Sequence, residues 1–145
     1  MKVKLRKYTA ALLVAAFAIF GHARAAEIDA AAKYKLHAVF IYNFISSVEW
    51  PKLVYTGSTK NIDLCIVGKD TMGAVIDAVA KKAASKGDVV INVKRDVTID
   101  NVESCNIAYI SFSENGDTPK ILAKTNGKPI LTVSENSGFL LSGGI

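Results

Sequence analysis

The chain has 145 residues, with 18 Lys and Arg against 13 Asp and Glu and a formal net charge of +5. An excess of bases can indicate binding to nucleic acid. Five of these bases, however, lie in residues 1–25, which contain no acid, so the rest of the chain carries 13 bases and 13 acids. The balanced remainder excludes the basic patch that a nucleic-acid-binding protein needs.

Residues 1–25 have the three parts of a secretory signal peptide. Four cations near the start precede an unbroken apolar run over 10–20, and Ala23 and Ala25 stand at the −3 and −1 positions of a cleavage site. An uncleaved membrane anchor is the alternative, although a spanning helix needs about 20 apolar residues. We therefore expect cleavage after Ala25 and a single domain over 26–145, located outside the cytoplasm and not inserted in the membrane.

A helix is predicted over about 29–48, ending before Pro51 because the residue preceding a proline is pushed out of the helical region. Apolar residues at helical spacing form a stripe that would face the core: Tyr34, Ala38, Ile41, Ile45 and Val48, widened on one side by Leu36, Phe40 and Phe44. His37 is the only histidine after residue 25 and projects onto this stripe. It is expected to be a hydrogen-bonded core residue rather than a metal ligand or a catalytic base.

Two strand–helix–strand units follow in series. The first has a turn-rich stretch at 55–61, a strand at 62–67, a helix at 72–84 and a strand at 89–94; the second has a strand at 107–112, a helix at 118–125 and a strand at 129–133. Between them, 96–104 is expected to form a turn or a single helical turn. The strand at 62–67 is almost continuously apolar, which is typical of a strand covered on both faces.

These units predict an α/β fold with an open, mostly parallel sheet, Rossmann-like or flavodoxin-like, and an additional N-terminal helix packed on one face. The short apolar run at 139–141 and the pair Gly143-Gly144 resemble the approach to one more strand. We therefore expect the C-terminus to be truncated.

Cys65 and Cys105 are the only cysteines. In an exported protein two thiols within reach of each other form a disulfide, and the alternative is two separate buried thiols. No Cys-x-x-Cys pair is present to lower a thiol pKa. One histidine and two distant cysteines do not have the spacing of a zinc site, so neither a metal nor a cofactor is expected.

The best place for a ligand in such a sheet is the crevice at the carboxyl ends of its strands. The first strand-to-helix turn supplies the candidate residues Gly68, Asp70, Thr71 and Gly73. It lacks the residues that complete a phosphate-binding loop, and the alternative is a plain glycine turn in which Asp70 caps the helix. With no G-x-S-x-G motif and no recognisable acidic pair, we expect no catalytic residues, and binding or regulation is favoured over enzyme activity.

Three motifs together resemble the YfiR-like family of periplasmic regulators, over about residue 33 to the end of the chain. They are the runs 40–44 and 48–51 (FIYNF and VEWP), the run 64–68 (LCIVG) with the later Cys105, and the run 131–133 (LTV) followed by GGI at 143–145. The resemblance implies a periplasmic protein that restrains an inner-membrane diguanylate cyclase by contacting its periplasmic part. Its action would lower cyclic di-GMP and biofilm formation. The resemblance also implies a homodimer and a disulfide between the two cysteines.

Asn43, Glu49, Trp50 and Pro51 are candidates for a partner surface, since aromatic residues are enriched at the centres of interfaces. The alternative is that Trp50 and Phe44 pack the helix onto the sheet while Asn43 binds a nearby backbone group. A second hypothesis for the function is a periplasmic small-molecule-binding domain that serves a transport or sensor system through the crevice at 68–73. An exported enzyme is the third.

Overall fold

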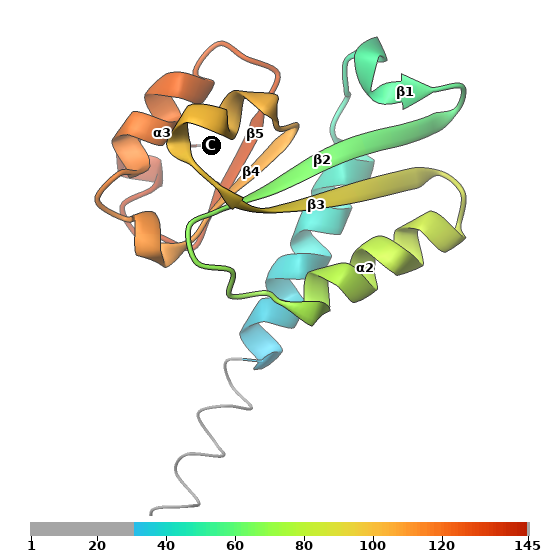
Figure 1. The fold of residues 1–145 in the computed structure, drawn as a ribbon, viewed down its shortest axis with the longest axis horizontal. Coiled ribbons are helices and arrows are strands. Elements are labelled where there is room, and N and C mark those ends of the chain that lie inside the picture. The colour runs from blue at the N-terminus through green and yellow to red at the C-terminus, as the bar shows by residue number, and fades with distance from the viewer. Residues whose placement is uncertain (1–30, 145) are drawn as a thin grey trace, which may run out of the picture. The chain divides into compact units, whose positions relative to one another are not determined.

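The computed structural model describes residues 31–144 (Figure 1). The predicted signal peptide and the first residues of the predicted N-terminal helix lie outside this range. The chain divides into two compact units, Met1–Leu36 and His37–Ile145. The first helix is described over 31–47, and its residues from 37 onward belong to the second unit.

One sheet organises the second unit. Its strands are β1 (Tyr55–Thr56), β2 (Thr59–Val67), β3 (Val89–Val97), β4 (Ile107–Ile110) and β5 (Leu131–Ser134). The four longer strands run parallel in the order β3-β2-β4-β5, and β1 pairs antiparallel with the start of β2. The predicted α/β fold with a mostly parallel sheet is therefore confirmed. The strand order agrees with the first four strands of a flavodoxin-like sheet, but assignment to that fold stays a prediction.

Two helices connect the parallel strands, α2 (Ala74–Ser85) between β2 and β3 and α3 (Thr118–Thr125) between β4 and β5. The two connections run in opposite directions along the sheet. Because parallel connections are right-handed, α2 and α3 lie on opposite faces. Four 3₁₀ helices complete the described elements: η1 (Lys52–Val54), η2 (Ile99–Ser104), η3 (Phe112–Glu114) and η4 (Leu140–Ser142). The helical turn expected within 96–104 is thus present as η2.

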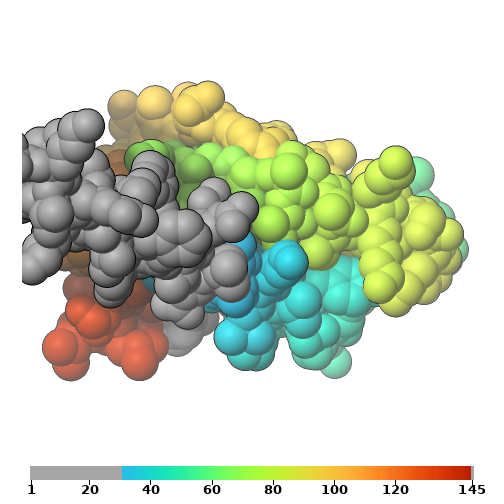
Figure 2. All heavy atoms as spheres, turned by 90° about the horizontal axis from the view of Figure 1, so that it is seen from below, coloured from blue at the N-terminus to red at the C-terminus, as the bar shows by residue number. Residues whose placement is uncertain are grey.

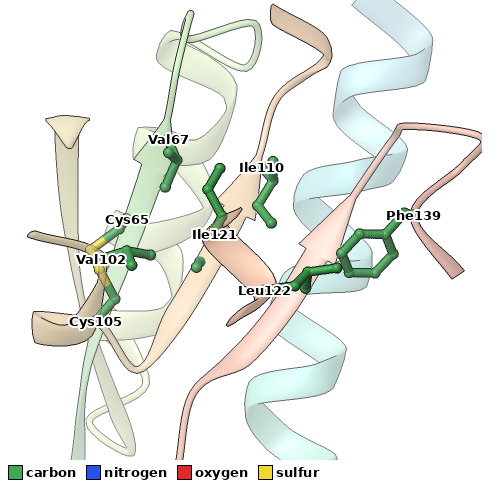
Figure 3. Packing of buried hydrophobic residues seen from close by; sticks show 9 residues of the cluster. Cys65, Val67, Val102, Cys105, Ile110, Ile121, Leu122 and Phe139 are labelled. Carbon is green, nitrogen blue, oxygen red and sulfur yellow. A yellow bond between two sulfur atoms is a disulfide. The ribbon is translucent and has the colours of Figure 1, made fainter. Parts of the chain in front are cut away.

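Both faces of the central strands are buried. Successive residues of a strand point to opposite faces, so Cys65 and Val67 pack toward α3 and η2, where Figure 3 shows them in a cluster with Ile121 and Phe139. Leu64 and Ile66 point to the other face and are also fully buried. The apolar run at 62–67 therefore has the physical origin predicted for it, a strand that is covered on both sides.

The first helix packs on the Leu64 face through a narrow stripe. Ala38, Ile41 and Ile45 are fully buried, as predicted. Leu36, Phe40 and Phe44, which were expected to widen this stripe, are instead 53%, 47% and 41% exposed. That part of the prediction was wrong because a helix lying on a sheet buries only the residues that point directly at it, and spacing alone does not show how wide that contact is.

The stretch at 55–61, predicted to be rich in turns, contains a β-hairpin. Thr56 pairs with Thr59, which leaves a two-residue turn at Gly57-Ser58. Gly57 has φ of 63°, a backbone angle that tight hairpin turns require and that glycine adopts without steric cost. The hairpin starts β2 three residues earlier than expected.

Several strand ends also differ from the prediction. β3 continues to Val97, and β4 stops at Ile110, so that Phe112 lies in η3 and is 65% exposed. β5 is shifted to Leu131–Ser134. The apolar run at 139–141 lies largely in η4, and Gly143, with φ of 92°, follows η4 as its C-cap; the further strand expected after this run stays a prediction. Helix α3, by contrast, has the predicted bounds.

Candidate functional site

The disulfide between Cys65 and Cys105 is present, so the alternative of two separate thiols was wrong. The S–S distance is 2.00 Å, and the two Cα atoms are 5.8 Å apart. Cys65 is fully buried on the central strand, and Cys105 follows η2 and is 4% exposed. Figure 3 shows the bond at one edge of the apolar cluster. It ties β2 to the segment that leads into β4.

The topological switch point of the sheet lies between β2 and β4, and η3 closes it. Lys69 donates its backbone N–H to Ser113 Oγ over 2.9 Å. Gly68 has φ of 86°, and a Cβ at this position would overlap atoms of Ser113 and Glu114. The side chains of η3 therefore occupy the space directly beyond β2 where an open sheet of this kind commonly binds a ligand.

A hollow of about 410 Å³ remains beside the side chains of η3, at the carboxyl ends of β2 and β3. Its lining includes Gly68, Lys69, Asp96 and Glu114. Asp96 has φ of 54°, the only positive φ of a non-glycine residue among those described. Of the four residues predicted for a ligand crevice, Gly68 lines this hollow, whereas Asp70, Thr71 and Gly73 do not.

Asp70 has a structural role at the start of the α2 connection. Its Oδ1 accepts the backbone N–H groups of Met72 and Gly73 over 2.8 and 2.9 Å, and its Oδ2 accepts Arg95 Nε over 2.7 Å. Burial raises the pKa of Asp70, but the hydrogen bonds from Arg95, Gly73 and Met72 together hold that pKa below its ordinary value. Arg95 also bonds Asp77 on α2. The carboxylate is therefore fully engaged in holding the turn.

The other two residues of the predicted crevice, Thr71 and Gly73, follow Asp70 in the same turn. Gly73 precedes α2 with φ of 48°. Thr71 Oγ1 is buried and has no hydrogen-bond partner among the described residues. The turn at 68–73 is thus a glycine turn held together by Asp70. The alternative was wrong in one respect, since Gly73 is the N-cap of α2 and Asp70 makes no capping hydrogen bond to the helix.

The residues predicted as a partner surface fall into two places. Trp50 is 8% exposed, and its indole N–H donates to the carbonyl of Ile45 over 2.9 Å, so it packs against the end of the first helix. Together with Glu49 and Pro51 it lines a hollow of about 490 Å³ that extends to residues 128–131. Asn43 lies elsewhere, in a groove between the first helix and α2.

His37 contacts the fully buried Tyr109 of β4. Its Nδ1 lies 3.3 Å from Tyr109 Oη, and the two ring centroids are 6.3 Å apart. The ring is half-buried, which agrees with a core histidine. Within residues 31–144, no group of His, Cys, Asp and Glu side chains is arranged to hold a metal ion.

A family model described as YfiR/HmsC-like matches residues 34–145. The chain belongs to the YfiR/HmsC-like family. The match includes the first helix from residue 34 onward, the whole sheet and both disulfide cysteines. A comparison with curated proteins finds no match.

Two features of this YfiR/HmsC-like chain were not predicted from its sequence. Phe40 and Phe44 form a stacked pair on the solvent side of the first helix, with centroids 6.5 Å apart. Lys82 of α2 and Lys86, the C-cap of that helix, line the groove that contains Asn43. The i, i+4 spacing of the two phenylalanines was a signal of their contact, but nothing local showed that they face solvent.

None of the helices described in this YfiR/HmsC-like chain is long and apolar enough to span a membrane.

Proposed function

We propose that this protein is a periplasmic regulator that represses an inner-membrane diguanylate cyclase by protein contact. It would act as a homodimer, without catalysis or a cofactor, and would lower cyclic di-GMP and biofilm formation. The observation that carries the proposal is the match to the YfiR/HmsC-like family over residues 34–145.

Two further features support export to the periplasm. The first 25 residues read as a signal peptide, and processing after Ala25 would leave a domain with balanced charge. The Cys65–Cys105 disulfide suits an oxidising compartment, because thiols in the bacterial cytoplasm are kept reduced. Both agree with a site of action on the periplasmic side of the inner membrane.

The proposal is tested by deleting the gene and measuring cellular cyclic di-GMP. We expect the level and biofilm formation to rise, and the full-length gene supplied from a plasmid to restore both. A version without residues 2–25 is the matched control, since it should remain in the cytoplasm and fail to restore them. An unchanged level after deletion, or rescue by the version without the signal, would contradict the proposal.

The second candidate, a small-molecule-binding domain for a transport or sensor system, has one observation in its favour. The hollow at the ends of β2 and β3 holds Asp96 in a backbone conformation that costs a non-glycine residue about 1–2 kcal/mol. A thermal-shift screen with periplasmic metabolites tests it. A true ligand should raise the melting temperature of the wild type and do so less for Glu114→Gln, while a screen with no stabilising compound counts against this function.

A further inference from the structure

A groove lies between the first helix and α2, and we call it the α2 groove. It has a volume of about 320 Å³. Figure 2 shows its two walls on one face of the molecule, the first helix in cyan and α2 in green to yellow-green. Its lining is formed by Val39, Tyr42, Asn43, Val79, Lys82, Ala83 and Lys86.

The floor of the α2 groove is apolar and opens onto exposed aromatic surface. Val39 is 48% exposed, and Phe40 and Phe44 continue the apolar surface around the solvent side of the first helix. The side-chain amide of Asn43 forms no hydrogen bond with the residues described, so it is available to a docked chain. Valine and phenylalanine side chains left half in water gain free energy when a partner covers them.

Cations border this apolar floor on one side. Lys86 is held there by Tyr42: its Nζ lies 3.2 Å from Tyr42 Oη and 5.3 Å from the ring centroid. Lys82, one turn earlier on α2, is exposed. Neither ammonium group has an ion-pair partner within residues 31–144, and the lining of the groove contains no Asp or Glu.

We propose that the α2 groove is a docking site for an amphipathic helix whose apolar face is flanked by acidic residues. Such a helix would cover Val39 and Phe40 with its apolar face and place carboxylates beside Lys82 and Lys86, which is the usual arrangement of a helix bound in a groove. We take this helix to come from the periplasmic part of the cyclase, and this assignment rests on the function proposed above.

Charge favours such a partner over a second copy of this chain. A second copy would present the same two lysines, and its own groove has no carboxylate to pair with them. Like charges that face each other across an interface oppose association. An amphipathic helix with acidic edges would both cover the apolar floor and place carboxylates beside the two lysines.

A binding measurement tests the surface without the cyclase. The probe is a fluorescein-labelled amphipathic peptide of about 18 residues, with Leu on one face and Glu along its edges, titrated with protein purified from the periplasm. We expect binding that weakens as salt rises and that is lost in the matched peptide with Lys in place of each Glu. Equal binding of both peptides, or no binding of the acidic one, would overturn the proposal.

Two pairs of variants locate the binding site. Lys82→Glu is expected to lower the affinity about fivefold and Phe40→Ala about tenfold. Phe40 does not line the groove but belongs to the exposed apolar surface of the same helix. The controls make the same changes away from both, Lys81→Glu on α2 and Phe112→Ala at an exposed phenylalanine of η3, and should leave the affinity unchanged. Equal losses in the controls would overturn the assignment.

Sedimentation of the same variants tests whether a second copy of this chain occupies the α2 groove instead. If Phe40→Ala or Lys82→Glu converts a dimer to a monomer, the α2 groove is an interface between copies of this chain and the proposal is wrong. If the oligomeric state is unchanged, the surface is free to receive another partner.

A measurement in cells separates failure of the surface from failure of the proposed function. In a deletion strain, plasmids with wild type or Lys81→Glu should lower cyclic di-GMP, whereas Lys82→Glu and Phe40→Ala, present at equal periplasmic amounts, should not. Rescue by all four means that the surface is wrong and the function right. A deletion without any effect on cyclic di-GMP means that the function is wrong, while the peptide titration still decides the surface.

Discussion

Arg95, at the end of β3, donates from Nε to Asp70 Oδ2 over 2.7 Å, and Asp70 uses its other oxygen to accept two backbone N–H groups ahead of α2. One carboxylate thus joins a strand to the turn that starts the neighbouring helix. We expect Asp70→Ala to lower the free energy of unfolding by about 1–2 kcal/mol, because it removes two hydrogen bonds that hold the turn ahead of α2 and the ion pair with Arg95. Urea unfolding measures this, with the exposed Asp88→Ala as control; equal stability of the two variants would contradict it.

The carboxylates of Asp70 and Asp63 should make the folded protein less stable in acid. Burial raises the pKa of Asp70 and of Asp63, but hydrogen bonds from Arg95 to the first and from Lys94 and Asn92 to the second outweigh it, so both folded-state pKa values lie below the ordinary value of an aspartate. Their contribution is complete above the unfolded-state pKa and is lost as the pH falls through the folded-state pKa. Urea midpoints between about pH 6 and pH 2 should therefore fall less steeply for the double variant Asp63→Asn/Asp70→Asn than for wild type. Parallel curves would show that these groups do not contribute.

Alanine substitutions at the adjacent residues Phe40 and Ile41 should lower the free energy of unfolding by very different amounts. Ile41 is fully buried, so Ile41→Ala is expected to cost about 2–5 kcal/mol. Phe40 is 47% exposed, and Phe40→Ala should cost less than about 1 kcal/mol. Thermal or urea unfolding of both variants checks the orientation of the helix, and a larger loss for Phe40→Ala would mean that the helix is rotated from the position described.

The disulfide should contribute a large part of the stability. It closes a loop with a sequence separation of 40 residues, for which the chain-entropy model gives about 4 kcal/mol. We expect the double variant Cys65→Ala/Cys105→Ala, and the wild type after reduction in urea, to unfold at clearly lower urea concentration than the oxidised protein. A single-site variant is a poor control because it leaves a free thiol in the core. An unchanged midpoint would contradict the prediction.

Processing of the N-terminus predicts a defined mass for the exported protein. Cleavage after Ala25 should give a chain that starts at Ala26 and lacks two hydrogens because of the disulfide. Intact-mass measurement of the periplasmic protein, before and after reduction, tests both features separately. A species that retains residues 1–25 in the membrane fraction would instead support an uncleaved anchor.

Much of the fold could be predicted from local patterns. The stripe of Ala38, Ile41 and Ile45, the apolar run in β2 and the bounds of α3 follow from residue spacing, since a helix buries every third or fourth residue and a strand covered on both faces is apolar throughout. Strand ends were less predictable. They depend on pairing, as at Thr59, which belongs to β2 because Thr56 lies opposite it.

The candidate site depended more on contacts between distant parts of the chain. The sequence placed Gly68 and Asp70 correctly in the first strand-to-helix turn, yet it could not show that Ser113 and Glu114 would close the space beside Gly68. Nor could it show that Arg95 would engage Asp70. These partners are separated by 25 to 46 residues along the chain, and no local pattern records which of them meet.

By itself, the sequence determined the alternation of strands and helices, the N-terminal position of the excess charge and the availability of two cysteines for one bond, because each follows from composition or short-range spacing. Only the tertiary structure decided which side of the first helix faces water and which lysines stand beside it. Val39 and Lys82 lie 43 residues apart in the sequence and line one groove, because α2 packs beside the first helix. Such a surface exists only once the chain has folded.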